Sequence, residues 1–467
     1  MNSSVRREIR NYFQTNALTL ENESLFSVVD VFGAPKWELV GGKMREATEP
    51  LSTAGDVSAQ TKALRQRFLT VQQRLLRNRV FEANELRSIE ALLGCGAASR
   101  EQVVVLGQLL QTGDGAYPWA IEDLTDRMFI EVAPECKFHA GLLTEGGVAV
   151  FEGTYDSGVL RVTAIGLVPS ESAEATRSAL GHANWFGGPG ATCVRSRPAL
   201  ARASAANPHQ QIVFLSDVTL DSPRVMAALW ELWNGFSASP PAAFVLCGNF
   251  SSCGTLPNQM TVLRDSFRRL ANQLAQFRTV FATTQFVFVP GGPQPPLPSS
   301  LFELFEERGV AASFASNPAR LLYANQEIVV FRRDLVHLLS RNSVQPCDQN
   351  TAEVEKPWEE TVRNVLSMAH LSPLPPHVAP VLWHYDYLLS LNPLPDLLVL
   401  ADRHVGYATR QSECVVANPG PFGGRQSGGS LDFHVYYPAS RVVEPSSIAA
   451  ANADNLEPVA PATVPAQ

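Results

Sequence analysis

The spacing of apolar residues divides the chain into segments with different predicted structures. Residues 61–81 (TKALRQRFLTVQQRLLRNRVF) show the period of one face of an amphipathic helix, which carries Leu64, Phe68, Val71, Leu75 and Val80. Residues 4–13 show the same period over a shorter length. Residues 25–39 form a brief apolar patch, and residues 40–58 are rich in Gly, Ser, Thr and acids, which predicts a loop.

The pattern changes between residues 100 and 168. Short apolar runs are separated there by Gly-Asp-Gly, Asp-Leu-Thr-Asp, Gly-Gly and Asp-Ser-Gly, which are turn sequences. About five strands in about 70 residues fit a small closed barrel of the OB type. We therefore expect an all-β domain at residues 98–170.

From residue 210 onward, apolar runs of strand length alternate with amphipathic helices. The predicted strands are QQIVFLSD, AAFVLCGN, QFVFVPGG, DLLVLADRH and ECVVANPG, and the predicted helices are SPRVMAALWELWNGF and MTVLRDSFRRLANQLAQF. Ser222 and Pro223 fit the N-cap and the first position of the first helix. This alternation indicates an α/β domain whose polar strand ends meet at one edge.

Composition narrows the class of protein. The chain has 467 residues, of which 45% are hydrophobic and 18% charged, and this describes a globular protein of two or three domains. No run reaches the ~20 apolar residues of a membrane span, and the N-terminus lacks the apolar segment of a secretory signal. The seven cysteines are scattered without a CxxC spacing, which predicts reduced thiols and neither a disulfide framework nor a zinc site.

Charge argues against broad nucleic-acid binding. The formal net charge is −8, and residues 98–170 contain ten acids against four bases, a balance that would repel a phosphate backbone. The opposite face of residues 61–81 is basic. It is either a binding face, for nucleic acid or for an acidic partner, or the solvated side of a surface helix. That face carries Lys62, Arg65, Arg67, Arg74, Arg77 and Arg79.

The predicted strand ends resemble a metal centre that has lost ligands. Two-metal phosphoesterases carry Asp-x-His, Gly-Asp-x-x-Asp, Gly-Asn-His-Asp/Glu and Gly-His-x-His at four such places. Here the first aspartate and the last histidine are retained, but the positions between them are changed. In chain order the matching residues are Asp217, Thr219, Asn249, Ser252, Gly292, Asp402 and His404.

The changed positions decide what chemistry remains. Two divalent cations repel each other, and a bridging carboxylate offsets that repulsion. Asn249 supplies an oxygen without the charge, and Gly292 supplies no ligand, so we expect neither a metal nor another cofactor. A residual single-metal site would suit manganese, iron or zinc and would use Asp217, Asn249, Asp402 and His404. His370 is either a further remnant or a histidine packed beside a Pro-rich turn.

An OB barrel followed by a degraded phosphoesterase domain resembles the B subunits of eukaryotic replicative DNA polymerases. Among these the chain is most similar to the second, non-catalytic subunits of DNA polymerase epsilon. The resemblance extends from about residue 25 to about residue 440. It is carried by LFSVVDVFGAPKWE, VVVLGQLLQ, CKFHAGLLTEG, NWFGGPG, VFLSDVTLD, FVLCGNFSS, FVFVPG, SNPARLLYANQEIVVFRRDL, HLSPLPPHVAPVLWHYDYLLSLNPLPDLLVLAD and ECVVANPGPF.

The resemblance implies a fold and a role. Residues 171–443 would form a calcineurin-like metallophosphoesterase domain that has lost its metal ligands, packed with the OB barrel. The chain would be a nuclear scaffold in chromosomal DNA replication, without catalytic activity. Its partners would be the C-terminal, cysteine-rich region of the polymerase epsilon catalytic subunit and the other polymerase epsilon subunits. It would meet DNA only through that complex.

The ends of the chain depart from this family. Members commonly begin with a compact helical domain linked to tethering the polymerase to the replicative helicase. Residues 1–24 leave room for a short helical remnant, so we expect a reduced helicase link, and residues 25–97 then lead into the barrel. Residues 444–467 are rich in Ala, Pro and Ser and are predicted to be disordered.

Two other functions remain alternatives, namely a cryptic single-metal phosphoesterase and an OB-fold module that binds nucleic acid. The Gly-rich stretch NWFGGPG lacks the spacing of a phosphate loop and is predicted to be a turn. Two aromatic groups, Trp185-Phe186 and residues 383–387, are either a partner surface or part of the core.

Overall fold

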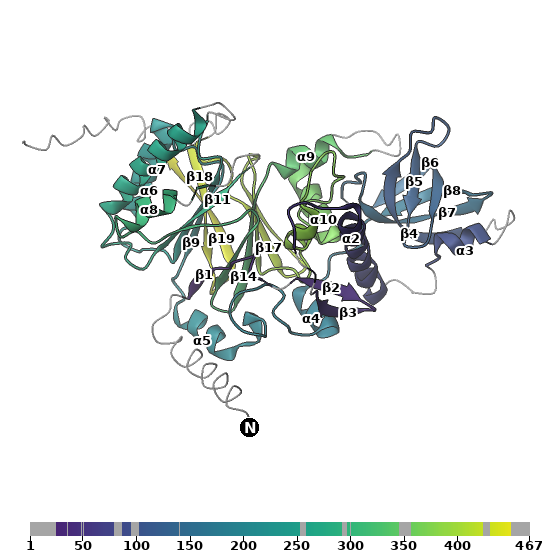
Figure 1. The fold of residues 1–467 in the computed structure, drawn as a ribbon, viewed down its shortest axis with the longest axis horizontal. Helices are drawn as coiled ribbons and strands as arrows, with labels where there is room; N and C mark the ends of the chain where they lie inside the picture. The colour runs from purple at the N-terminus through teal and green to yellow at the C-terminus, as the bar shows by residue number, and fades with distance from the viewer. Residues whose placement is uncertain are drawn as a thin grey trace, which may run out of the picture.

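The computed structural model describes most of residues 25–449 (Figure 1). The gaps are residues 35, 48, 50, 79–85, 95–101, 140, 253–257, 292–296, 299, 345–355 and 424–429. The helix expected at residues 4–13, Gly292 and the last residues of the predicted tail lie outside the described residues. No described helix is long and apolar enough to cross a membrane.

Two six-stranded sheets lie face to face in the larger part of the molecule. The first has the strand order β12 (Ala312–Phe314), β11 (Gln285–Pro290), β10 (Ala243–Gly248), β9 (Ile212–Leu215), β18 (Ser430–Tyr437) and β19 (Val442–Ala449). The second has the order β1 (Phe26–Val28), β13 (Ala319–Tyr323), β14 (Gln326–Arg332), β15 (Leu397–Ala401), β17 (Cys414–Asn418) and β16 (Tyr407–Gln411). The predicted α/β architecture is confirmed, with its strands shared between two sheets.

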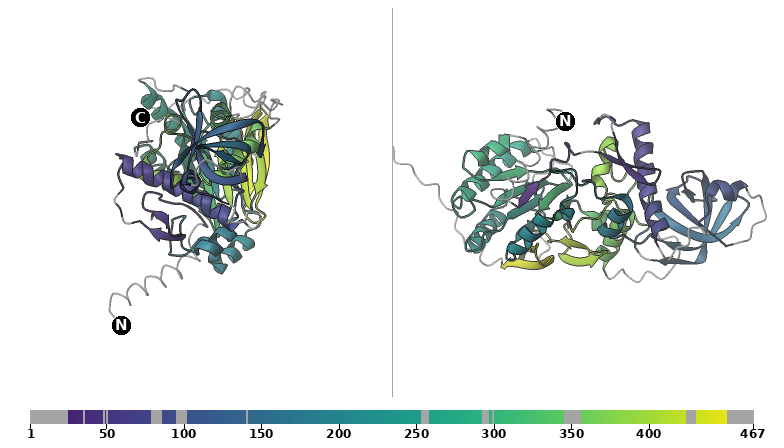
Figure 2. Two further views of the ribbon diagram at one scale, coloured as in Figure 1. Left: turned by 90° about the vertical axis from the view of Figure 1, so that its right-hand side faces the viewer. Right: turned by 90° about the horizontal axis from the view of Figure 1, so that it is seen from below.

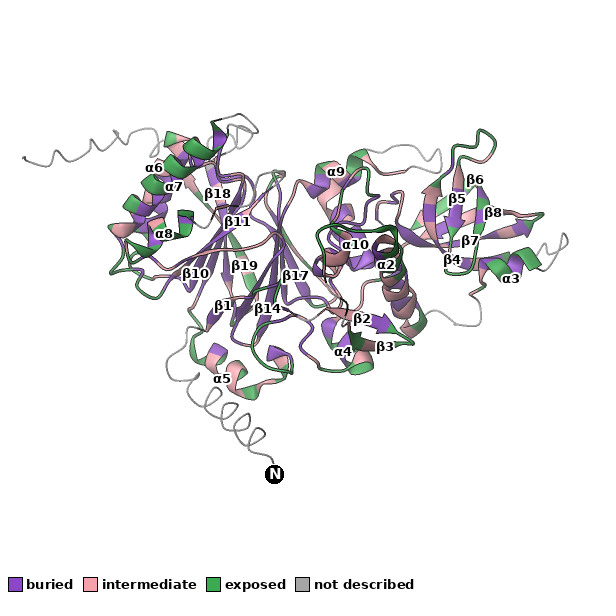
Figure 3. Ribbon diagram, viewed as in Figure 1, coloured by how far each residue is buried: buried purple, intermediate pink, exposed green. Residues whose placement is uncertain are grey.

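The space between the sheets is the central core of this part. Branched and aromatic side chains from both sheets meet there, as the buried strands of Figure 3 show. Complete burial of each such side chain contributes about 1.5–3 kcal/mol. The buried residues include Phe214, Val245, Val287, Ile328 and Val399.

Helices cover the outer face of each sheet. α6 (Pro223–Phe236), α7 (Gln259–Ala275) and α8 (Ser300–Glu306) pack on the first sheet, and α9 (Leu335–Arg341), α10 (Pro357–Met368) and the 3₁₀ helix η3 (Trp383–Leu389) pack on the second. The predicted start of α6 is confirmed, because Ser222 is its N-cap and Pro223 its first residue. Further short helices are η2 (Val194–Ser196), α5 (Pro198–Ala206), α4 (Ala173–Leu180) and α3 (Ile89–Gly94).

The predicted barrel is confirmed as a closed five-stranded one. Its strand order is β4 (Gln102–Gln111), β5 (Trp119–Glu122), β6 (Arg127–His139), β8 (Val159–Gly166) and β7 (Val148–Asp156). The side chains of Val105, Ile121 and Phe151 fill its interior without solvent exposure. Figure 2 shows the barrel at one end of the molecule and the two-sheet part at the other.

The helix α2 (Val57–Arg77) lies between the barrel and the two-sheet part. Its apolar face is buried as predicted, and three arginines of its basic face are bound within the protein, which neither interpretation of that face anticipated. Arg67 forms an ion pair with Asp386, Arg74 donates to the carbonyl oxygens of Leu366 (2.9 Å) and Leu391, and Arg77 forms an ion pair with Glu171. Arg67, Arg74 and Arg77 therefore fasten the helix to the rest of the protein, whereas Lys62 and Arg65 on the same face are exposed to solvent.

Two further expectations from the sequence are wrong. Residues 40–58 are not simply a loop, because β2 (Trp37–Val40) and β3 (Lys43–Glu46) form a hairpin around Gly41 and Gly42, which both have positive φ. Residues 444–449 are not disordered, because they belong to β19, which pairs with β18 along its whole length. Pro445 argued against a strand in the sequence, because proline cannot donate a backbone hydrogen bond. The proline is tolerated here because β19 lies at the edge of its sheet.

A buried histidine makes the stability of this fold dependent on pH. His434 in β18 is 3% exposed, and burial lowers its pKa from 6.5 to about 4. Since the unfolded chain takes up this proton at a higher pH than the folded one, stability is complete above pH 6.5 and falls as the pH drops toward 4. We expect a loss of about 3 kcal/mol across this window, measured by urea unfolding at several pH values.

The variant His434→Leu provides the control for this prediction. It should flatten the pH dependence without abolishing it, because burial also lowers the pKa of His370. A variant with the same pH dependence as the natural chain would contradict the assignment to His434.

Candidate functional site

Polar and charged residues gather where the central parallel strands of both sheets end. Residues that follow β9, β10, β11 and β15, and the last residue of β14, lie at this edge, as expected for an α/β fold. The strands of the two sheets also meet here, because the Ser216 hydroxyl donates to the carbonyl oxygen of Asp402 (3.0 Å). We call this group the strand-end cluster, and its members are Asp217, Asn249, Gly291, Arg332, Asp334, Asp402 and Arg403.

The backbone at the ends of β9 and β10 is unusually close-packed. A Cβ atom on Gly248 would lie 2.5 Å from the Val218 carbonyl oxygen, so only glycine fits at that position. Asp217 and Phe250 adopt left-handed backbone conformations with φ of 53° and 55°, which residues other than glycine rarely adopt. Backbone hydrogen bonds from Val218 to Cys247 and from Phe250 to Val218, both 3.0 Å, hold this arrangement.

The guanidinium of Arg332 occupies the middle of the strand-end cluster. Its side chain is 2% exposed and lies 2.9 Å from the Asp217 carboxylate and 2.7 Å from the Asp334 carboxylate. A Cβ atom on Gly291 would lie 2.5 Å from Asn249 Oδ1 and 2.8 Å from Arg332 Cγ, so the arginine stem fills the space between these positions. The carboxylates of the cluster are therefore compensated by a buried organic cation.

A second arginine completes the charge balance around Asp217. Arg403 Nε lies 3.0 Å from Asp217 Oδ1, and its side chain is about half exposed. Burial alone would lower the pKa of Arg403, but the neighbouring Asp217 carboxylate outweighs it and raises that pKa. Asp217 thus contacts two cations that belong to the protein itself.

The other predicted ligands do not converge on Asp217. Asp402 uses its two carboxylate oxygens to accept hydrogen bonds from the backbone N–H groups of Val336 (2.9 Å) and His404 (3.0 Å). Burial raises the pKa of Asp402 in spite of these bonds. The imidazole of His404 lies 3.1 Å from its neighbouring carbonyl oxygen on Val405. Within the described residues, no group of three or more His, Cys, Asp or Glu side chains could hold a metal ion.

The residues at two of the changed ligand positions have local partners. The backbone N–H and the hydroxyl of Ser252 donate to Asp221 Oδ2 at 2.8 and 2.5 Å. Thr219 lies in an isolated bridge with Phe250. These contacts stabilise the turns beyond β9 and β10, and neither residue contributes a metal ligand.

Sequence reasoning missed the two arginines that decide the chemistry of the cluster. Arg332 belongs to FRRDL, which does not look like the end of a strand because β13 and β14 contain Arg320, Gln326 and Glu327 among their apolar residues. Arg403 directly follows Asp402 in the sequence. An arginine that directly follows Asp402 is the signal that could have pointed to a cation in the cluster.

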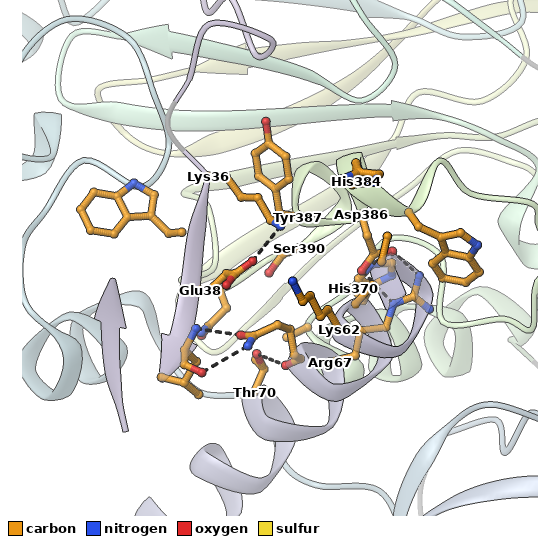
Figure 4. A pocket seen from close by; sticks show the side chains of 18 of the residues that line it. Lys36, Glu38, Lys62, Arg67, Thr70, His370, His384, Asp386, Tyr387 and Ser390 are labelled. Carbon is orange, nitrogen blue, oxygen red and sulfur yellow. Dashed lines mark hydrogen bonds and ion pairs between the residues drawn. The ribbon is translucent and has the colours of Figure 1, made fainter. Parts of the chain in front are cut away.

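A cavity of about 200 Å³ lies away from the strand-end cluster, between α2, β2 and η3 (Figure 4). Arg67 and His370 both contact the buried Asp386 carboxylate, and together they lower its pKa although burial would raise it. His370 Nδ1 accepts from the N–H of Ser372 (3.0 Å) beside the Pro-rich turn. His370 is therefore a packed histidine outside the strand-end cluster, and its interpretation as a remnant of a metal site is wrong.

The predicted aromatic clusters are only partly in the core. Trp185 is buried, at 7% exposed, while Phe186, Trp383, Tyr385 and Tyr387 are partly exposed. The stretch NWFGGPG is a turn, as predicted, in which the Asn184 side chain donates to the carbonyl oxygens of Gly188 (3.2 Å) and Gly190 (2.9 Å).

Two family models match the chain. The model for the B subunit of DNA polymerases alpha and epsilon matches residues 212–409, and the model for the DNA polymerase epsilon subunit 2-like OB-fold domain matches residues 57–169. The second match includes α2 together with the barrel. Among solved structures, an archaeal phosphodiesterase is 10% identical and covers 51% of this chain and 100% of its own with a TM-score of 0.29, which is too low to establish a shared fold.

Curated relatives resemble the chain over most of its length. The probable DNA polymerase epsilon subunit 2 of Caenorhabditis elegans is 39% identical over 94% of this chain and 82% of its own. DNA polymerase epsilon subunit 2 of Homo sapiens is 34% identical over 91% and 84%, and the DNA polymerase epsilon B subunit of Arabidopsis thaliana is 30% identical over 91% and 83%. Matches of this extent show that the chain belongs to the family of DNA polymerase epsilon subunit 2 proteins, also called B subunits.

Proposed function

We propose that this chain is a non-catalytic subunit of the DNA polymerase epsilon holoenzyme in the nucleus. It binds the C-terminal, cysteine-rich region of the catalytic subunit and contacts DNA only as part of that complex. The family membership supports the assignment to the holoenzyme. A link to the other polymerase epsilon subunits belongs to the same proposal.

The position of Arg332 is the observation that best supports the absence of catalytic activity in this proposal. In a metallophosphoesterase, metal cations activate the nucleophile and stabilise the leaving oxygen. Here the retained aspartate is compensated by Arg332 at 2.9 Å and Arg403 at 3.0 Å. A fixed guanidinium in this place repels an incoming cation and cannot activate a water nucleophile by coordinating it, as a metal ion does. We propose that this is a calcineurin-like domain that has lost its metal ligands, and that the cryptic phosphoesterase is the weaker alternative.

We expect the purified chain to contain no stoichiometric manganese, iron or zinc and to leave bis-p-nitrophenyl phosphate unhydrolysed. Elemental analysis of the isolated chain after dialysis against each metal is the measurement. One metal ion per chain that is lost in an Asp217→Ala variant, together with metal-dependent hydrolysis, would restore the phosphoesterase alternative.

The barrel offers one feature that favours nucleic acid, and it sets a further test. Tyr117 and Phe129 stack at 5.6 Å between ring centroids next to Arg127, and aromatic rings of this kind can stack on bases. The ten acids of residues 98–170 oppose this function. We therefore expect the whole chain to bind oligo-dT with a dissociation constant no better than about 10⁻⁴–10⁻⁶ M at physiological salt.

Fluorescence anisotropy with labelled oligo-dT measures this affinity. Submicromolar binding that Tyr117→Ala or Trp119→Ala weakens would show that the barrel is a nucleic-acid module. The same affinity in all variants, at the level of non-specific binding, is the expected result.

A further inference from the structure

A groove of about 820 Å³ opens directly in front of the strand-end cluster. Asn249, Arg332, Arg333 and Arg403 line it, together with residues of η3, α9 and the loop after β1. We call it the strand-end groove. Phe32 and Leu382 form part of its wall.

One wall of the strand-end groove is apolar and open to solvent. Phe32 is 62% exposed and Leu382 54% exposed, and both belong to the few large apolar side chains that the described part of the chain exposes this far. Phe32 packs edge-on against Tyr385 with 5.7 Å between ring centroids. A large apolar side chain of a ligand would be removed from water against this wall, and its burial would favour binding.

One cation that lines the groove has no carboxylate partner among the described residues. Arg332 and Arg403 pair with the carboxylates of Asp217 and Asp334, and Asp402 lies close to both of these arginines. Arg333 is partly buried, and its guanidinium forms no hydrogen bond or ion pair with any described residue. Of the three arginines that line the groove, Arg333 is thus the one without an acidic partner, in a chain whose net charge is −8.

We propose that the strand-end groove binds a short segment of a partner protein in which a large apolar side chain stands next to acidic residues. The apolar side chain would cover Phe32 and Leu382, and a carboxylate would pair with Arg333. A ligand that covers Arg333 removes the guanidinium from water, and a carboxylate on that ligand offsets the resulting desolvation penalty. The inference rests on the proposed function, since a subunit without chemistry of its own can use a former catalytic cleft for docking.

The wall favours a peptide over nucleic acid. A phosphate backbone would satisfy Arg333 but would leave the apolar side chains of the wall exposed to water or place them against charged phosphates. A peptide with alternating acidic and apolar side chains satisfies both surfaces. Charge complementarity and the exposed apolar wall thus point to the same class of ligand.

Selection of a random peptide library displayed on phage against the immobilised whole chain tests the proposal. Enriched peptides should carry Leu, Phe or Trp next to Asp or Glu, and a fluorescein-labelled copy should bind in a polarisation assay. Arg333→Glu and Leu382→Asp should each weaken that binding by about tenfold or more, equivalent to about 1.4 kcal/mol. The exposed Arg278, outside the groove, provides the matched control Arg278→Glu, which should bind like the natural chain.

Three results would overturn the inference. One is enrichment of peptides without acidic residues, another is binding that neither groove variant weakens, and the third is displacement of the peptide by oligo-dT at lower concentration than by unlabelled peptide. Co-purification of the catalytic subunit's C-terminal region separates this inference from the proposed function. If the natural chain retains that region but selects no such peptide, the groove proposal fails and the scaffold function stands.

Discussion

Replacement of Arg332 by leucine is expected to lower the free energy of unfolding by about 3–5 kcal/mol, because it removes the buried cation that Asp217 and Asp334 share and leaves the largely buried Asp217 with only the half-exposed Arg403. Asp217 and Asp334 lie 2.9 and 2.7 Å from this guanidinium, which is 2% exposed. Urea unfolding at pH 7 followed by tryptophan fluorescence measures the change. In a functioning metal centre, by contrast, the loss of a nearby arginine would leave the metal to compensate Asp217.

Two variants make this prediction specific. Arg403→Leu should change stability by less than about 1 kcal/mol, because its side chain is about half exposed and solvent screens its ion pair. The double variant Arg332→Leu, Asp217→Leu should recover part of the loss, because one uncompensated carboxylate is gone. Equal effects of Arg332→Leu and Arg403→Leu would show that Arg332 does not have the central role assigned to it.

The second large effect is expected at the contact between α2 and η3. Asp386→Leu should cost about 3–5 kcal/mol, because it leaves the Arg67 guanidinium and the His370 imidazole without the carboxylate that they share. The variant should also hold α2 less firmly. In hydrogen-exchange mass spectrometry, the backbone amides of α2 should therefore exchange faster than in the natural chain, while those of the barrel strands should be little changed. Both measurements use the whole chain.

The same helix offers a matched control. Lys62 pairs with Glu49 at 2.5 Å, but both side chains are 50% exposed. Glu49→Gln should therefore leave the unfolding curve and the exchange of α2 unchanged. A destabilisation as large as that of Asp386→Leu would mean that α2 is held along its whole length and not mainly by its buried arginines.

Most of the fold was predictable because it follows simple periods. The turn sequences of the barrel, the Ser-Pro start of α6 and the apolar strands β9, β10 and β11 each indicate their structure locally. β14 was missed because its first residues, Gln326 and Glu327, are polar, although Glu327 is buried in an ion pair of 2.6 Å with Arg177, a residue far away in the sequence. β19 was missed because its pairing with β18 overrides a weak local preference.

The site could be predicted only in part for a related reason. The amide at Asn249 is visible in the sequence, since it depends on one position after one strand. The pairing of Asp217 with Arg332 depends on two strands from different sheets meeting at one edge, with the two residues 115 positions apart in the chain. Likewise, the basic residues of α2 looked solvated because Asp386 and Glu171, their partners, lie in distant segments.

The most direct test of the scaffold function is co-expression of the whole chain with the C-terminal region of the DNA polymerase epsilon catalytic subunit. We expect a one-to-one complex in sedimentation-velocity analysis that persists in moderate salt, since an obligate interface is largely apolar and weakly screened. A stable monomer that remains separate from that region under the same conditions would contradict the scaffold function.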